Sequence, residues 1–347
     1  MNARALAAIA TAVALAPTVC VAANPLGPGQ LAWILSAGAY MAMLNTSISG
    51  TPTAATLLDG YFNTTRTYVI VYNEVSGTIN KSAFYDQVRQ NLPRANLVVD
   101  VVNESTLETY LGNGPIDSNV GAIMYDDEGG ATWPTSSTEK PYPAYYIPKA
   151  RAAIDAYNKK YGTHLVLLSV PAADLSAIVI EPPTESGGAT RYDNFLQEGI
   201  PGIAAQQATI YEIQSQKAIQ DGGQALYAMY TNCGAGQARL ASSGVVVLGG
   251  LSTYIVSTGY HSTHGELFAA VKNTALAPEN VTCANANDWT DVNWRNYPPP
   301  GNWNGLTPGG FTNIEPIAVS GFWLNIPQNM YADQALYLLQ DLSHYGD

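Results

Sequence analysis

The sequence predicts a (β/α)8 barrel, in which parallel strands alternate with helices around one axis. Seven short runs rich in β-branched residues recur along the chain, and most are followed by a segment whose apolar residues have helical spacing. No glycine-rich dinucleotide loop follows the first run, which favours a barrel over a doubly wound sheet. No repeat of fixed period is visible, which disfavours a solenoid.

The first half of the chain contains three expected strands. Each is an apolar run of strand length: residues 67–74 (TYVIVYNE), 96–102 (NLVVDVV) and 120–126 (VGAIMYD). The helices that follow them are expected at about 81–92, at 106–111 and, after a long loop, at 144–161.

The second half contains four more expected strands. They are residues 165–170 (LVLLSV), 208–214 (ATIYEIQ), 244–251 (GVVVLGGL) and 318–326 (AVSGFWLNI). The first of them leads into a Pro- and Gly-rich excursion over 172–189 and a helix near 192–198. The eighth strand is not evident. It lies either between 273 and 316 or within the apolar segment 31–44, which otherwise predicts a helix closing the bottom of the barrel.

Residues 1–23 have the pattern of a cleavable signal peptide. Arg4 supplies the positive charge, small apolar residues follow from 5 to 16, and Val21-Ala22-Ala23 offers a cleavage site. The stretch is too short for a spanning helix, which needs about 20 apolar residues. We therefore expect a secreted protein, extracellular or periplasmic, that has no membrane contact after cleavage. Its mature part, residues 24–347, is expected to form a single barrel domain.

Two cysteines remain after that processing, Cys233 and Cys283. A pair of cysteines in an exported chain is more often a disulfide than two free thiols. The sequence therefore predicts one bridge between them.

Composition limits the partners. The net charge is −12, which disfavours nucleic acid and anionic membranes because both need a basic surface. Only 12% of the residues are charged, while Asn, Gln, Ser, Thr and Tyr are abundant, and such a surface suits a neutral polar ligand such as carbohydrate. We expect a monomer that uses no cofactor.

The active site of such a barrel lies at the carboxyl ends of its strands. Polar and aromatic residues at those ends are therefore the candidates for substrate contacts. They are Glu74 on the first expected strand, Asp100 on the second, Tyr125, Asp126 and Glu128 on the third, Glu212, Gln214 and Gln216 on the fifth, and Trp323 and Asn325 on the last.

Strand alternation orders the third-strand candidates. Side chains two residues apart face the same way, so Asp126 and Glu128 point into the mouth while Asp127 points towards the helices. Two carboxylates in a neutral, aromatic-rich cleft suit glycoside hydrolysis, in which one group gives a proton and the other stays charged. Like charges held close together favour this division, because they raise one of the two pKa values.

The segments 121–128 (GAIMYDDE) and 321–324 (GFWL) resemble two strands of family-18 chitinases and endo-N-acetylglucosaminidases. The resemblance implies that Glu128 protonates the glycosidic oxygen and that Asp126 orients the acetamido group of the substrate, which acts as the nucleophile. It also implies that Trp323 forms the floor of the sugar site. Met124 stands where the family motif has a further Asp, and the motif falls on the third expected strand instead of the fourth.

The residues themselves also allow an unassisted mechanism. In that case the second carboxylate is Glu74, Asp100 or Glu212, each at the end of another expected strand.

An aromatic-rich loop is expected at about 284–312. It contains Trp289, Trp294, Tyr297 and Trp303 among Asn, Pro and Gly. These rings, together with Trp133, provide stacking surfaces for sugar rings, or alternatively they anchor a long loop over the barrel.

Two other classes of function fit some features. A barrel that binds carbohydrate without turnover has the same cleft. A metal-dependent polysaccharide deacetylase would bind its metal through the aspartates at 126–127 and the pair His261 and His264. The histidines of such enzymes are four residues apart, in the motif His-Ser/Thr-X-X-His, whereas His261 and His264 are three apart. A Ser-His-Asp hydrolase is disfavoured because no Gly-X-Ser-X-Gly segment occurs.

Overall fold

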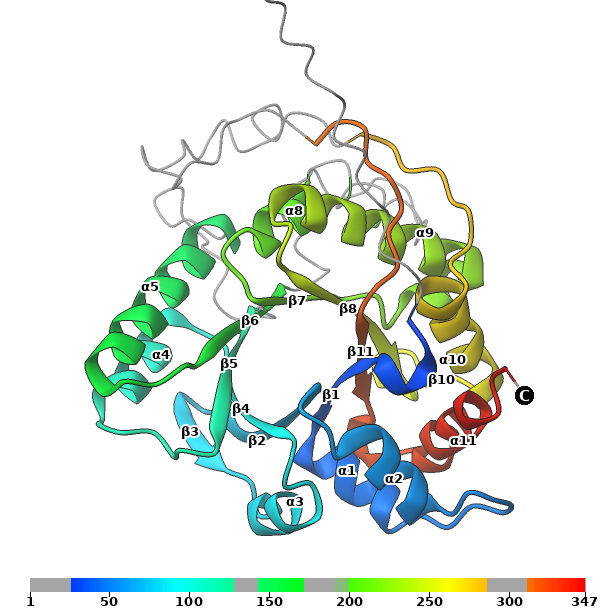
Figure 1. Ribbon diagram of the computed structural model, residues 1–347, viewed down its shortest axis with the longest axis horizontal. Coiled ribbons are helices and arrows are strands. Elements are labelled where there is room, and N and C mark those ends of the chain that lie inside the picture. Colours follow the sequence, from blue (N-terminus) through cyan, green and yellow to red (C-terminus); the bar gives the residue numbers. More distant parts are fainter. Residues whose placement is uncertain are drawn as a thin grey trace, which may run out of the picture.

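The computed structural model describes residues 26–127, 143–171, 192, 196, 199–285 and 311–346. Eight parallel strands form a closed barrel in the order β1-β2-β4-β5-β6-β7-β8-β11, and β1 closes it by pairing with both β11 and β2. Helices surround the strands in the view of Figure 1. The predicted (β/α)8 barrel is confirmed.

The barrel strands are β1 (Ala32–Ser36), β2 (Thr67–Val75), β4 (Asn96–Val101), β5 (Val120–Asp127), β6 (Val166–Pro171), β7 (Ile210–Ile213), β8 (Val246–Ser252) and β11 (Gly321–Asn325). Three short strands lie outside the barrel ladder: β3 (Thr78–Lys81), β9 (Tyr254–Ile255) and β10 (Tyr260–His261). The α-helices are α1 (Ala37–Leu44), α2 (Ala54–Phe62), α3 (Tyr85–Asn91), α4 (Glu104–Gly112), α5 (Pro143–Tyr161), α8 (Ile200–Ala205), α9 (Ala218–Ala241), α10 (His264–Val271) and α11 (Ala332–Ser343). Short helical turns occur at η1 (Pro28–Gln30), η2 (Lys272–Leu276) and η4 (Pro327–Asn329).

The eighth strand lies in the segment 31–44, and it is the first strand of the barrel. Residues 32–36 form β1, and Ser36 ends the strand by accepting a hydrogen bond from the Ala39 amide at 3.0 Å, which caps α1. The expectation of a helix along the whole segment is therefore wrong for its first half. The count of all later strands rises by one, so the strand that carries Asp126 is the fourth.

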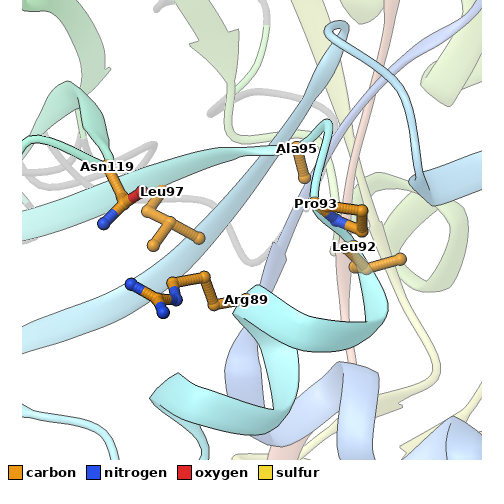
Figure 2. Close-up of a pocket in the computed structure, with 6 residues that line it drawn as sticks. All are labelled: Arg89, Leu92, Pro93, Ala95, Leu97 and Asn119. Atoms are coloured by element: carbon orange, nitrogen blue, oxygen red, sulfur yellow. The ribbon is translucent and has the colours of Figure 1, made fainter.

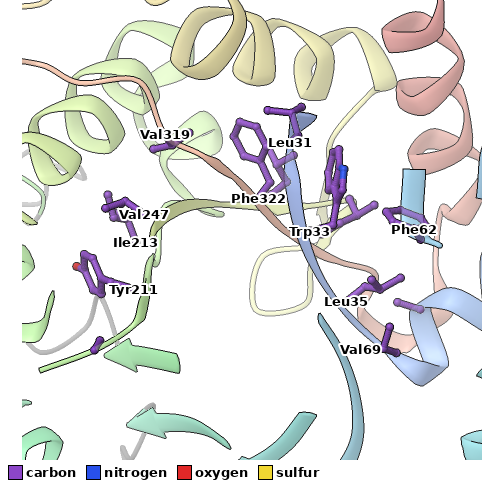
Figure 3. Close-up of a cluster of buried hydrophobic side chains, with 14 of the residues drawn as sticks. Leu31, Trp33, Leu35, Phe62, Val69, Tyr211, Ile213, Val247, Val319 and Phe322 are labelled. Atoms are coloured by element: carbon purple, nitrogen blue, oxygen red, sulfur yellow. The ribbon is translucent and has the colours of Figure 1, made fainter. Parts of the chain in front are cut away.

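The side chains of the barrel strands divide into two apolar layers. The outer layer packs between the strands and the helices and includes Trp33, Tyr211 and Phe322 (Figure 3). Trp33 meets Phe62 of α2 edge to face, with ring centroids 5.7 Å apart. The inner layer fills the barrel and includes Met124 and Trp323. Membership of these two layers shows which way each strand residue faces.

A hairpin precedes the helix that was expected at 81–92. Ser76 and Gly77 both have positive φ angles, 51° and 79°, and they form the two-residue turn between β2 and β3. The helix α3 consequently begins only at Tyr85. The other expected helices at 106–111 and 144–161 agree with α4 and α5 to within two residues.

Cys233 of α9 is bonded to Cys283, with their Cα atoms 5.5 Å apart. The predicted disulfide is confirmed. It ties the longest helix of the described chain to the segment that follows η2.

Some expected features lie outside the described residues. These are the signal peptide, the excursion at 172–189, most of the helix near 192–198 and nearly all of the aromatic-rich loop. Within the parts that the structure describes, no helix is both long enough and apolar enough to cross a membrane.

Candidate active site

Asp126 faces the inside of the barrel at the carboxyl end of β5. Met124 belongs to the inner layer and Tyr125 to the outer layer, so alternation returns Asp126 to the inside. Its partner in the ladder is Val170 of β6, which is also an inner residue. Asp126 is only 6% exposed. This placement is the one expected for a carboxylate that acts at the barrel mouth.

Two further carboxylates face inward on other strands. Asp100 of β4 pairs with Met124, and Glu212 of β7 pairs with Leu248. Both partners belong to the inner layer. Glu212 is completely buried, and a carboxylate is kept inside a barrel only where polar groups surround it. The structure therefore brings Asp100, Asp126 and Glu212 to the inner surface of the barrel.

Gly250 of β8 makes room for Glu212. A Cβ atom at Gly250 would lie 2.6 Å from Oε1 of Glu212 and 2.5 Å from Cδ of Gln216. These two side chains therefore cover the inner face of Gly250, where any larger residue would displace them. Glu212 and Gln216 had been expected to share a face, whereas Gly250 carried no signal in the sequence beyond its place in an apolar strand.

Hydrogen bonds to Gly250 fix the backbone beside these side chains. The amide of Gly250 donates to Oγ of Ser215 at 2.9 Å, and its carbonyl accepts from the Tyr227 hydroxyl at 3.0 Å. Tyr227 comes from α9. Burial, together with the negative charge of Glu212, raises the pKa of the Tyr227 hydroxyl, so this group stays protonated and remains a donor.

Trp323 and Asn325 lie on the inner face of β11. Trp323 is an inner-layer residue, 8% exposed, and its ladder partners are Gly250 and Ile34. Asn325 is the last residue of β11 and pairs with Ser252 at the end of β8. Trp323 is therefore the strand neighbour of Gly250, whose inner face Glu212 and Gln216 cover. Gln214, one residue beyond β7, is partly exposed at the same end of the barrel.

Glu74 is placed elsewhere. Its carboxylate accepts hydrogen bonds from the Val102 amide at 2.9 Å, from Nδ2 of Asn103 at 2.7 Å and from Oγ1 of Thr106 at 2.9 Å. It therefore holds the first turn of α4. The pairing of β2 with β4 shifts between Ile70 and Tyr72, and this irregularity interrupts the inside–outside alternation before Glu74 is reached.

Tyr125 does not line the barrel interior either. It is 2% exposed and packs in the outer layer, beneath the helices. Its position follows from strand alternation, because it directly precedes the inward-facing Asp126. Glu128, Trp133 and the side chain of Asp127 lie outside the described residues, although the backbone of Asp127 ends β5.

The two histidines of the deacetylase alternative have separate partners. His264 Nδ1 lies 2.7 Å from Oδ2 of Asp341 on α11, and the ring of His261 lies 4.8 Å from that of Tyr331. Among the residues that the structure describes, no group of three or more His, Cys, Asp and Glu side chains is arranged to hold a metal ion.

A separate cavity opens at the other end of the barrel. It measures about 400 Å³ and is lined by Arg89, Leu92, Pro93, Ala95, Leu97 and Asn119 (Figure 2). Leu97 stands near the start of β4 and Asn119 directly precedes β5. This is the amino end of the strands, which in such barrels serves stability more than catalysis.

Comparison with known proteins identifies structural likeness alone. No protein-family model matches the chain, and no curated protein matches it. Among solved structures, the ChiA C-terminal domain of Legionella pneumophila shares 11% identity with a TM-score of 0.43, covering 90% of this chain and 97% of that one. A family-18 glycoside hydrolase N-acetylglucosaminidase from Paenibacillus barengoltzii shares 9% identity with a TM-score of 0.40, covering 90% and 99%.

Proposed function

We propose that this protein is a secreted glycoside hydrolase that acts on a polysaccharide or glycan through carboxylate acid–base catalysis. The observation that carries the proposal is the buried Asp126, which faces inward at the carboxyl end of the fourth barrel strand. Glu128 follows it by two residues in the sequence, and the sequence predicts that the two side chains share a face. We assign Glu128 as the general acid and Asp126 as its partner.

The assigned roles follow from the chemistry of the glycosidic bond. Glu128 gives its proton to the glycosidic oxygen as the bond from the anomeric carbon to that oxygen breaks. Positive charge then develops on the sugar ring, and the inward-facing carboxylates stabilise it. A general acid must be protonated at working pH, and negative charges close by favour its protonated form.

The nucleophile is either an acetamido group of the substrate, oriented by Asp126, or a second carboxylate of the protein. Glu74 is a poor candidate for that carboxylate, because three hydrogen bonds hold its oxygens at the start of α4. Asp100 and Glu212 both face the barrel interior and keep the unassisted route open. Gln216 lies with Glu212 over Gly250, and Trp323 is the strand neighbour of Gly250. The amide and the indole would offer polar and stacking contacts to a sugar ring.

The test is hydrolysis of a panel of N-acetylated and neutral polysaccharides by the purified mature protein. We expect release of reducing ends from at least one of them, and the release should persist after dialysis against a strong chelator. Release of acetate instead of reducing ends, lost on such dialysis and restored by zinc, would support the deacetylase. Binding to a polysaccharide without any release would identify a non-catalytic carbohydrate-binding barrel.

A further inference from the structure

Three aromatic rings gather beyond the carboxyl ends of the last two barrel strands. Tyr254 and His261 lie on the β9–β10 hairpin that follows β8, and Tyr331 lies on the loop that follows β11. The Tyr331 ring centroid is 5.7 Å from that of Tyr254 and 4.8 Å from that of His261. His261 is exposed and the two tyrosines are partly exposed. We call these three residues the ring cluster.

The hairpin presents two of the rings on one face. Tyr254 and His261 are direct partners across the antiparallel β9–β10 pair, so their side chains point the same way. The hairpin is tied to the β11 loop by the buried Thr253. The Thr253 hydroxyl donates to the Met330 carbonyl at 2.9 Å, and its amide donates to the Asn325 carbonyl at 3.1 Å. The ring cluster is therefore held in position relative to the end of β11.

The loop that carries Tyr331 has an unusual backbone. Gln328, Asn329 and Tyr331 have φ angles of 55°, 58° and 59°, in the left-handed region that residues other than glycine rarely adopt. Such conformations persist where surrounding contacts enforce them, and they concentrate at functional sites. Here the strained backbone holds a tyrosine ring beside the barrel mouth.

We propose that Tyr254, His261 and Tyr331 form an accessory binding site for the pyranose rings of a carbohydrate chain. A pyranose ring has a face of C–H groups that stacks on an aromatic ring, while its hydroxyl groups bind at the polar edges of Tyr and His. The cluster follows the strands that end in Ser252 and Asn325, so a chain held there extends from the mouth of the barrel. The substrate class rests on the proposed function, whereas binding at the cluster is tested separately from hydrolysis.

The test is affinity electrophoresis of the mature protein in native gels containing soluble glycol chitin, hydroxyethyl cellulose or xylan. We expect at least one polymer to retard the wild-type protein. Tyr331→Asn and His261→Ala should each raise the dissociation constant for that polymer about tenfold, because each removes an aromatic contact. Asn is chosen at position 331 because it tolerates the left-handed backbone, so the loop keeps its shape.

His264→Ala is the matched control. His264 also contacts a tyrosine ring, that of Tyr337 at 5.4 Å, but on α10 and α11 outside the barrel. This variant should migrate as the wild type does. Equal retardation of the wild type and both cluster variants would overturn the proposal, and so would the absence of retardation in every gel. If retardation depends on the ring cluster but the wild-type protein hydrolyses no polymer, the binding site is supported and the proposed hydrolase is refuted.

Discussion

At the scale of single residues, the proposed chemistry rests on residues 126–128. Glu128→Gln keeps the size of the side chain but removes its proton, so we expect turnover on the active polysaccharide to fall about 100-fold or more. Asp126→Asn should also slow the reaction, because the inward-facing carboxylate is lost. The measurement is kcat for each purified variant, with thermal unfolding used to confirm that folding is intact.

Asp127→Asn is the internal control for these two substitutions. The sequence predicts that strand alternation turns the Asp127 side chain away from the interior, so we expect this variant to retain the wild-type rate. A severe loss in Asp127→Asn with a mild loss in Glu128→Gln would show that the side-chain alternation differs beyond Asp126. The assignment of Glu128 as the acid would then be abandoned.

Gly250 is a second residue whose identity matters. In Gly250→Ala the new methyl group would meet Glu212 and Gln216 at 2.5–2.6 Å, so both side chains must move. We expect kcat/KM to fall about 10- to 100-fold, because misplaced polar groups no longer fit the substrate. Unfolding in urea should also show a loss of about 1–3 kcal/mol from overpacking.

Gly249→Ala is the matched variant on the other face of β8. Its methyl group would crowd Thr231, Tyr227 and Phe322 at 3.1–3.3 Å, in the outer layer. This variant should lose less stability and keep most of its kcat/KM, because its neighbours need to shift by only a few tenths of an ångström. If Gly250→Ala kept as much of the wild-type kcat/KM as Gly249→Ala does, Glu212 and Gln216 would take no part in the reaction.

At the scale of elements, Glu74 joins β2 to α4. Glu74→Gln replaces an acceptor oxygen with a donor that faces other donors, and it removes a negative charge from the amino end of the helix. We expect the free energy of unfolding to fall by about 1–3 kcal/mol in urea titrations. Glu108→Gln, an exposed position on the same helix, should change it by less than about 0.5 kcal/mol. If Glu74→Gln lost activity without losing stability, Glu74 would take part in the reaction instead of stabilising the start of α4.

At the scale of the whole molecule, the disulfide and the proposed export are tested together. The bridge closes a loop with a sequence separation of 50, which in the chain-entropy model stabilises the fold by about 4 kcal/mol. Thiol titration of the exported protein, unfolded but not reduced, should find no free thiol. One thiol per chain would indicate that Cys20 is retained and the signal peptide uncleaved, and two or three would contradict the bridge.

Several features of the fold were determined by the sequence because they depend on local geometry. Successive side chains of a strand point in opposite directions, so the inward position of Asp126 follows once the strand is recognised. The same rule turns Tyr125 outward, so the selection of Tyr125 as a candidate for substrate contact did not follow the alternation. The pairing of Cys233 with Cys283 followed from the number of cysteines that remain if the expected signal peptide is removed.

Other features were decided only by the tertiary structure, because they depend on residues far apart in the chain. The apolar run at 32–36 is compatible with a helix or a strand, and pairing with both β2 and β11 makes it the strand that closes the barrel. The shifted pairing of β2 and β4 sends Glu74 to α4. Gly250 and Glu212 belong to adjacent strands joined by a helix, and their contact exists only where the barrel curvature brings both side chains to one surface.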